Sequence, residues 1–347
     1  MTGPTFSMLC CAVGAEKAVK KSMADDGWRL AFSRPGFVTA KHDEHREPPT
    51  GIFIRTSAAS IGTARSDDSN EQIATLIQSL QSCGRNGRPF DQLHVWPKDR
   101  VAIGRFDFEP VLDEVSKAIA DQVFGAIRDD WLRCDAPNRI AQPDESVLDV
   151  VLVEPAHWFF GVHTADHWPS RWPGGVQPMS PENDPVSRAY YKAAEAITWS
   201  GFDMQAGDLV AEVGSAPGGA CGRLLELGFR VIGIDPANMD ERISGHPKFR
   251  HIRARAEDLP RKEFRGVKWL LVDSNVKPYK TLRAVGDIVS NRNSDIEGML
   301  LTMKLGDYKS SELIQSWVDQ IQSWGASEIR VRQLARNKCE VCIAVRM

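Results

Sequence analysis

The chain has 347 residues, of which 42% are hydrophobic, and its formal net charge at pH 7 is −3. This composition predicts a globular protein with a sizeable core, and the length favours two or three domains. The nearly balanced charge does not by itself indicate a nucleic-acid partner. No apolar run approaches the roughly 20 residues that span a bilayer, so no membrane segment is expected.

The seven cysteines are irregularly spaced, which excludes a disulfide framework. Cys339 and Cys342 form a CxxC pair in an expected strand, where residues three apart point to opposite faces. No second pair completes a zinc site, so buried free thiols are expected. The N-terminal stretch has neither a basic leader nor a long apolar core, and we expect no signal peptide. These features together predict a reducing, cytoplasmic location.

Residues 1–165 mix short apolar runs with helical patterns, which predicts a small α+β domain. In the helix expected over 69–84, Ile73, Ile77 and Leu80 recur at helical spacing and Gly84 ends the pattern. The other expected helices are residues 16–27 and 109–127. The expected strands are residues 6–13, 36–42, 51–56, 92–98 and the long apolar stretch 147–165.

Residues 166–184 are crowded with Pro, Gly and Trp and have no periodicity, which predicts a linker. A helix is expected over 184–201, with Asp184 as its N-cap, Pro185 at its first position and Gly201 at its end. Strand and helix patterns then alternate through residues 185–347. This order predicts an α/β domain with a largely parallel, doubly wound sheet and helices on both faces. The expected strands and helices are residues 208–214, 222–228, 229–235, 248–254, 267–273, 298–304, 311–325, 328–334 and 339–346.

A glycine-rich turn, GSAPGG over residues 214–219, joins an expected strand to an expected helix. Such a turn lets backbone N–H groups and the helix N-terminus approach a ligand closely. Dinucleotides require G-x-G-x-x-G, but Ala216 replaces the second glycine and Pro217 removes an N–H where a pyrophosphate would need one. The turn therefore favours S-adenosylmethionine over a nicotinamide cofactor.

Two acids accompany this turn. Asp235 ends the next strand and is placed to accept hydrogen bonds from ribose hydroxyls. Glu212 lies beside the turn, and its charge suits the ammonium group of S-adenosylmethionine.

Four further residues indicate chemistry rather than binding alone. Asp273 and Lys304 each close an apolar strand, at the sheet edge where ligand crevices form in α/β proteins. A lysine directly after an apolar strand requires a partner, and the aspartate would provide one. Lys192 lies in the helix before the turn, and Glu340 lies in the last strand.

The motifs SRAYYK, EVGSAPGG, VDSN, TMKLG and RNKCEV resemble, in order and spacing, the FtsJ-type ribose 2′-O-methyltransferases that act on large-subunit ribosomal RNA. The resemblance covers most of the chain and is specific over residues 185–347. It implies an N-terminal THUMP RNA-binding domain and a Rossmann-like catalytic domain without a metal. Lys192, Asp273, Lys304 and Glu340 match the catalytic tetrad of this family. The implied S-adenosylmethionine-binding residues are Glu212, Gly214, Ala216, Pro217, Gly218, Gly219, Asp235, Asp258 and Asp273.

The resemblance further implies a cytidine of large-subunit ribosomal RNA as substrate, modified before ribosome assembly is complete. A neutral Lys304 would remove the proton of a ribose 2′-hydroxyl, and Lys192 would supply the neighbouring positive charge. The chain departs from the family at Glu212, where Asp is usual, and at Ala189 and Ala220. None of these departures removes a tetrad residue.

Several alternatives remain open at this stage. The chain could be a catalytically silent RNA-binding module or, less well supported by its turn, a nicotinamide oxidoreductase. His157, His163 and His167 could bind a metal, and the aromatic run 158–160 could stack on bases rather than pack in a core. Basic residues also cluster locally, as a solvated face or as a contact for RNA. They are Arg250, Arg253, Arg255, Arg261, Lys262, Arg265 and Lys268.

Overall fold

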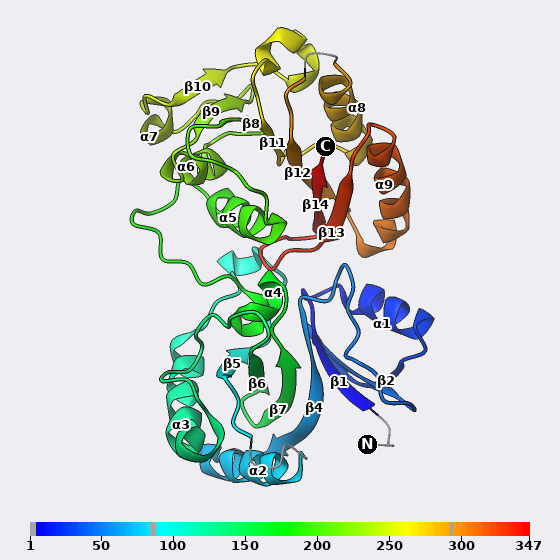
Figure 1. The fold of residues 1–347 in the computed structure, drawn as a ribbon, viewed down its shortest axis with the longest axis vertical. Coiled ribbons are helices and arrows are strands. Elements are labelled where there is room, and N and C mark those ends of the chain that lie inside the picture. The colour runs from blue at the N-terminus through cyan, green and yellow to red at the C-terminus, as the bar shows by residue number, and fades with distance from the viewer. Residues whose placement is uncertain (1–4, 84–87, 292–293) are drawn as a thin grey trace. The chain divides into compact units, whose positions relative to one another are not determined.

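The protein was analysed as a computed structural model that describes residues 5–83, 88–291 and 294–347. The chain divides into two compact units, Met1–Pro178 and Met179–Met347 (Figure 1). Gly84, the expected end of a helix, lies outside the described residues. The assignment of residues 1–165 to a THUMP-like domain and of 166–184 to a linker stays a prediction.

Unit 1 is built on a seven-stranded mixed sheet in the order β2-β3-β1-β4-β7-β6-β5, in which only β5 and β6 are parallel. Helices α2 and α3 pack on this sheet against β4 and β5. The strands are β1 (Thr5–Cys10), β2 (Arg29–Arg34), β3 (Phe37–His42), β4 (Thr56–Arg65), β5 (Gln92–Pro97), β6 (Ser146–Glu154) and β7 (His157–Thr164). The helices are α1 (Glu16–Asp25), α2 (Ser69–Ser82), η1 (Arg105–Asp107), α3 (Glu114–Trp131), α4 (Trp168–Arg171) and η2 (Pro173–Gly175).

The sheet of unit 1 differs from the expectation in three places. Strand β2 was not expected, the apolar stretch 147–165 forms two antiparallel strands, β6 and β7, and the central strand β4 replaces the strand expected over 51–56. Residues 51–56 were expected to be a strand, but of these only Thr56 belongs to one. Residues 51–55 form a turn in which Ile54 N–H donates to the Gly51 carbonyl. The strand is instead β4, whose sequence TSAASIGTAR is rich in small and polar residues. Because β4 lies between β1 and β7, its neighbours cover it, and cross-strand pairing rather than intrinsic propensity determines its structure.

The aromatic run of β7 is part of the core of unit 1. Trp158 and Phe160 are fully buried in one apolar cluster, and Phe159 lies in a second. Packing is therefore the correct interpretation of residues 158–160, and the base-stacking alternative is wrong. The first part of the expected linker, residues 166–184, is packed against unit 1. Trp172 is buried, and η2 packs against β5.

Unit 2 contains a second seven-stranded sheet, in the order β10-β9-β8-β11-β12-β14-β13. The first five strands in this order are parallel, and β14 runs antiparallel to both of its neighbours. The strands are β8 (Leu209–Val213), β9 (Arg230–Ile234), β10 (Phe249–Ile252), β11 (Trp269–Val272), β12 (Gly298–Lys304), β13 (Glu328–Arg332) and β14 (Glu340–Arg346). The expected α/β sheet is confirmed, with a reversed strand inserted near one end.

Helices cover both faces of this second sheet (Figure 1). Leu300 of β12 packs with Trp199 of α5 and Leu224 of α6, whereas α8 packs on the opposite side of β12, where Met299 and Leu301 are buried. The helices are α5 (Ala189–Ser200), α6 (Gly219–Glu226), α7 (Glu241–Ser244), η3 (Ala256–Asp258), η4 (Arg261–Phe264), α8 (Pro278–Val289), η5 (Tyr308–Leu313) and α9 (Ile314–Gln322).

Helix α5 begins later than its sequence signals predict. Asp184 was expected to cap it, but the helix starts at Ala189, without a side-chain cap. Ser187 accounts for this, because its carbonyl accepts from Tyr190 N–H and its side chain lies where a Cβ on Gly219 would sit, 2.2 Å away. The close approach of this segment to the glycine-rich turn thus determines where α5 starts. The predicted end at Gly201 is confirmed by its left-handed φ of 58°.

Candidate active site

Four ionisable residues from different elements of unit 2 meet at the carboxyl edge of the parallel strands. Asp273 directly follows β11, and Lys304 is the last residue of β12. Glu340 is the first residue of β14 and stands directly opposite Lys304 in the antiparallel register. Lys192 reaches the same point from α5, which packs on this face of the sheet.

The four side chains form a closed ring in which charges alternate. Lys192 Nζ lies 2.5 Å from Asp273 Oδ2 and 2.6 Å from Glu340 Oε1. Lys304 Nζ lies 2.6 Å from Asp273 Oδ1 and 2.5 Å from Glu340 Oε2. Each lysine therefore contacts both acids, and each acid bridges both lysines. The sequence predicted all four residues, and the fold brings all four together.

Burial and charge act in opposite directions on this ring. Glu340 and Lys192 side chains are 5% and 9% exposed, whereas Asp273 and Lys304 are 22% and 24% exposed and face the open side. Burial alone would raise the pKa of Glu340, but Lys192 and Lys304 outweigh it and lower the pKa to about 2. Burial likewise favours neutral Lys304, but Glu340 and Asp273 prevail and raise its pKa. The ring thus holds Lys304 protonated at neutral pH.

Two residues that the sequence analysis missed hold the ring in place. Asn337 is buried, and its Nδ2 donates to Glu340 Oε1 at 3.3 Å. Glu195 lies one helical turn after Lys192, 1% exposed, and accepts from the backbone N–H groups of Ala335 and Arg336 at 2.7 and 3.1 Å. Helix α5 therefore supplies a ring lysine and also anchors the loop that carries Asn337. The only sequence signal was an acid in an otherwise apolar stretch of that helix.

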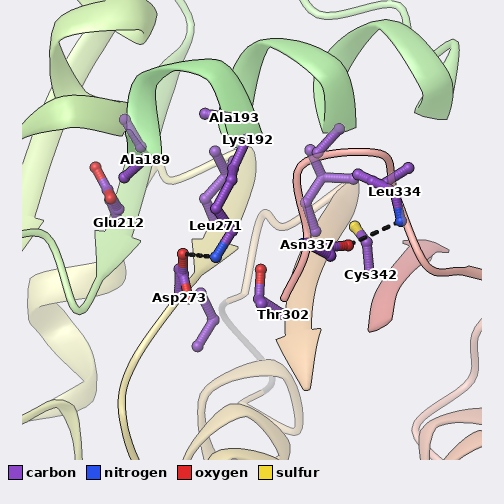
Figure 2. A pocket seen from close by; sticks show the side chains of 14 residues that line it. Ala189, Lys192, Ala193, Glu212, Leu271, Asp273, Thr302, Leu334, Asn337 and Cys342 are labelled. Atoms are coloured by element: carbon purple, nitrogen blue, oxygen red, sulfur yellow. Dashed lines mark hydrogen bonds and ion pairs between the residues drawn. The ribbon is translucent and has the colours of Figure 1, made fainter. Parts of the chain in front are cut away.

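A small cavity of about 30 Å³ lies behind the ring (Figure 2). Figure 2 shows Lys192 extending from α5 to Asp273, with Thr302 of β12 and Asn337 of the loop before β14 at the same space. Glu212 lines this cavity and not the open cleft; it is 2% exposed and accepts from Cys221 Sγ at 2.8 Å. Burial raises the pKa of Glu212 to about 8, so this acid is largely neutral at pH 7.

The open side of the ring faces a cleft of about 1360 Å³. One part of it is lined by the glycine-rich turn through Gly214, Ser215 and Ala216, and by Asp235 at the end of β9. Gly214 is required here, because a Cβ at this position would lie 2.5 Å from the Asp273 carbonyl oxygen and its φ is +83°. The turn and the ring are therefore in direct contact through backbone.

The remaining sequence-predicted cofactor residues take other positions. Asp235 lines the cleft, and its carboxylate accepts from Ala216 N–H at 3.3 Å and Ala237 N–H at 2.8 Å. Pro217, Gly218 and Gly219 are not among the residues that line it. The Pro217 carbonyl accepts from Asp240 N–H at 2.9 Å, a Cβ on Gly218 would meet Ile243 of α7, and Gly219 is the first residue of α6. Asp258 is exposed and outside the cleft, where Glu257 lies instead.

The three histidines considered as a metal site have separate partners. His157 Nε2 lies 2.9 Å from Thr63 Oγ1, and His163 bridges Asp149 and the Ser170 carbonyl. His167 pairs with its neighbour Asp166. Within the described residues, no group of three potential ligands is placed to bind a metal ion. All seven cysteines are free thiols.

Within the residues that the structure describes, no helix is long and apolar enough to cross a membrane. The cleft wall facing the turn is formed by the start of α8 and by η5, including Lys277, Tyr279, Lys280 and Leu313. Tyr279 is 61% exposed and Leu313 is 52% exposed, so this wall presents large side chains with apolar surface to solvent.

The chain is similar in sequence to curated ribosomal RNA methyltransferases. It is 25% identical over 329 residues to the ribosomal RNA large subunit methyltransferase M of Laribacter hongkongensis, covering 89% of this chain and 85% of that protein. The protein of the same name from Halorhodospira halophila is 26% identical over 203 residues, which cover 57% of each chain. A possible methylase from Clostridium difficile 630 aligns over 99% of this chain and 98% of its own, with 10% identity and a TM-score of 0.34. No family model matches the sequence.

Proposed function

We propose that this protein uses S-adenosylmethionine to methylate large-subunit ribosomal RNA, and that the acceptor is a ribose 2′-hydroxyl, of a cytidine. The similarity to proteins named ribosomal RNA large subunit methyltransferase M supports the RNA and the reaction class. The observation that carries the finer proposal is the ring of two lysines and two carboxylates beside the glycine-rich turn. A hydroxyl acceptor requires a group that removes its proton, and this ring offers an amine for that step.

The cleft fits the cofactor. Backbone at residues 214–216 and the Asp235 carboxylate would hold its adenosine, with the carboxylate accepting from ribose hydroxyls. S-adenosylmethionine supplies an electrophilic methyl group on a positively charged sulfur. Asp273 belongs to both the cleft wall and the ring, so it would position the reacting groups relative to each other. A nicotinamide cofactor is disfavoured, because Ala216, which lines the cleft, stands where G-x-G-x-x-G requires its second glycine.

Lys304 is the proposed base, because it is the more exposed of the two ring lysines and lines the cleft. Lys304 would accept the 2′-hydroxyl proton on Nζ as the ribose oxygen bonds to the methyl carbon and the methyl–sulfur bond breaks, which leaves S-adenosylhomocysteine. Lys192 would stay cationic beside the developing negative charge. In the open site the two carboxylates raise the pKa of Lys304. Covering its exposed part with RNA strengthens the opposing effect of burial, which favours the neutral amine that can act as a base.

The wall formed by α8 and η5 would receive the target nucleotide. Tyr279 offers an exposed aromatic face on which a base can stack, and Lys277 and Lys280 flank it with positive charge for the phosphates. Unit 1 would bind the RNA away from the reacting nucleotide, in the role expected of a THUMP-like domain. The cytoplasm, where RNA not yet assembled with ribosomal proteins is found, is the proposed location.

The test is single-turnover methylation of a protein-free large-subunit RNA transcript, followed by mapping of 2′-O-methyl sites. Lys304→Ala should lower the rate about 10²–10⁴-fold while S-adenosylmethionine affinity stays near parental. Lys304→Arg should fail almost as badly, because a guanidinium stays protonated and cannot accept a proton. Near-parental rates in Lys304→Arg would make Lys304 an electrostatic anchor instead. Methylation of a base, not a ribose, would refute the 2′-hydroxyl acceptor, and cofactor binding without any transfer would favour a silent RNA-binding module.

A further inference from the structure

A second feature of unit 2 lies at the opposite edge of the same sheet from the cleft. A groove of about 440 Å³ opens where β8, β9 and β10 begin. Its floor is apolar and includes Val231, Ile232 and Phe249. Strand β9 connects the two sites, because Arg230 at its start lines the groove and Ile234 at its end lines the cleft. These residues are four positions apart, which is about 13 Å along a strand.

The rim of this groove is strongly basic, although the chain as a whole is slightly acidic. Five exposed cations line it, and Glu263 is the one carboxylate among the lining residues. These cations are Arg230, Lys248, Arg250, Lys262 and Arg265. Five like charges around one groove repel one another, and an anion that binds there would reduce this electrostatic repulsion.

Most of these cations are not neutralised by an acid. Arg250 pairs with Glu263 at 3.0 Å, but Arg230 and Lys248 donate to the backbone carbonyls of Gly207 and Gly228, at 3.0 and 3.2 Å. Across the described ranges, no carboxylate lies within 4.0 Å of the charged groups of Arg230, Lys248, Lys262 or Arg265. Two of these cations, Arg230 and Lys248, therefore bond to neutral carbonyls and have no carboxylate partner among the described residues.

Further arginines connect the groove to the cleft. β10 is the outermost strand of the sheet, and the exposed Arg250, Arg253 and Arg255 follow one another along it and its continuation. Arg250 lines the groove and Arg255 lines the cleft, while Arg253 donates to the Pro236 carbonyl between them. Charges on an edge strand also prevent pairing with other strands. Protection of the edge strand does not explain the groove at the amino ends of the strands, and it does not explain the cation Lys262 on η4.

We infer that this groove and the β10 edge form a binding site for an RNA phosphate backbone, continuous with the cleft and distinct from unit 1. The inference rests on the proposed function for the identity of the RNA. Arginine and lysine side chains on a rim suit phosphates, and an apolar floor with Phe249 suits an unstacked base. RNA would then contact unit 2 on both edges of its sheet, which holds the strand in register while one nucleotide occupies the cleft.

The experiment uses the full chain and a protein-free large-subunit RNA transcript, with affinity measured over a series of salt concentrations. The double variant Lys262→Ala/Arg265→Ala should weaken binding roughly tenfold at moderate salt and reduce the slope of log K against log salt by about 1.4, for two lost contacts to single-stranded phosphate. The matched control is Arg242→Ala/Lys268→Ala, which removes the same charge from residues paired with Asp240 and with Asp208 and Glu297. Its slope should stay close to that of the parent.

Arg265→Glu provides a second variant at an exposed position, and it should weaken binding more than either alanine substitution alone. An unchanged slope and affinity in both groove variants would overturn the inference, as would an equal loss in the control. The parent's methyl transfer to the same RNA is measured in parallel. If RNA binding depends on the groove but no methyl group is transferred, the proposed function is refuted and the groove remains an RNA-binding site. If methyl transfer occurs and RNA binding does not depend on the groove, the groove inference is refuted and the proposed function stands.

Discussion

Glu340 is the most informative residue to change, because its charge supports both stability and the ionisation of Lys304. Its pKa of about 2 lies below the ordinary 4.5 because two lysines contact it, despite burial. A shift of this size corresponds to about 3 kcal/mol of stability, from 1.36 kcal/mol for each unit of pKa. Since the folded-state pKa is depressed, this contribution is present above pH 4.5 and is lost as the pH falls through about 2.

Glu340→Gln mimics the protonated acid, so the variant should be about 3 kcal/mol less stable than the parent at pH 7. At pH 3, where the parent has already lost part of the contribution, the difference should shrink to about 1.4 kcal/mol. Native-state hydrogen exchange of the β14 amides measures this free energy locally, without requiring the two units to unfold together. The control is Glu257→Gln, an exposed carboxylate of the same cleft outside the ring.

The same substitution should change the pH dependence of catalysis. Of the influences that raise the pKa of Lys304, Glu340 is the largest, so its removal should lower that pKa. The rising alkaline limb of the single-turnover rate should then move to lower pH in the variant, even though misplacement of the lysines lowers the plateau. If the alkaline rise of the rate stays at the same pH in the variant, a group other than Lys304 is responsible for it. A stability difference equal at pH 3 and pH 7 would show that the ring is not stabilised by charge.

Three further results are expected. Asp235→Ala should weaken S-adenosylmethionine binding by roughly 1.5–3 kcal/mol, the value of a hydrogen bond to a charged group, and calorimetry with unchanged affinity would remove Asp235 from the site. Tyr279→Ala should raise the KM for RNA about tenfold or more with kcat less affected, whereas Tyr279→Phe should be near parental; equal effects of the two would argue against stacking. Glu195→Ala should destabilise the 334–338 loop by about 1–3 kcal/mol, since two buried N–H groups lose their acceptor, and should lower the transfer rate without changing cofactor affinity. If Glu195→Ala transfers methyl groups at the parental rate, Asn337 does not depend on Glu195 for its position.

The sequence pattern marked two members of the ring, Asp273 and Lys304, whereas Lys192 and Glu340 were expected from the family resemblance. The catalytic role of the ring stays a prediction. Asp273 and Lys304 stand where apolar strands end, and parallel strands bring such positions to one edge. Periodicity likewise predicted the strands of unit 2, whose buried runs are distinctly apolar. These features depend on residues within a few positions of each other, so pattern alone identifies them.

What pattern could not predict depends on contacts between distant residues. β4 consists of small polar residues and becomes a strand because β1 and β7 pair with it. Glu195 binds backbone about 140 positions away, which no spacing rule anticipates. Asp184 had every mark of an N-cap, but the packing of Ser187 against Gly219 delays the helix. Glu212 was expected at the cofactor, but it lines the small cavity behind the ring and is not among the residues that line the cleft, so its contact with the cofactor stays a prediction.

Lys304 and Glu340 are paired across β12 and β14, so the ring can form only when these two strands align in the correct register. If β14 paired one residue out of step, Val341 would replace Glu340 opposite Lys304, and the acid would move to the other face of the sheet. Both lysines would then share Asp273 alone, and an uncompensated charge beside the core costs several kcal/mol. Misaligned chains would therefore be penalised by the same residues for which we propose a catalytic role. Insertions or deletions between β12 and β14 should be tolerated only when they leave this alignment intact.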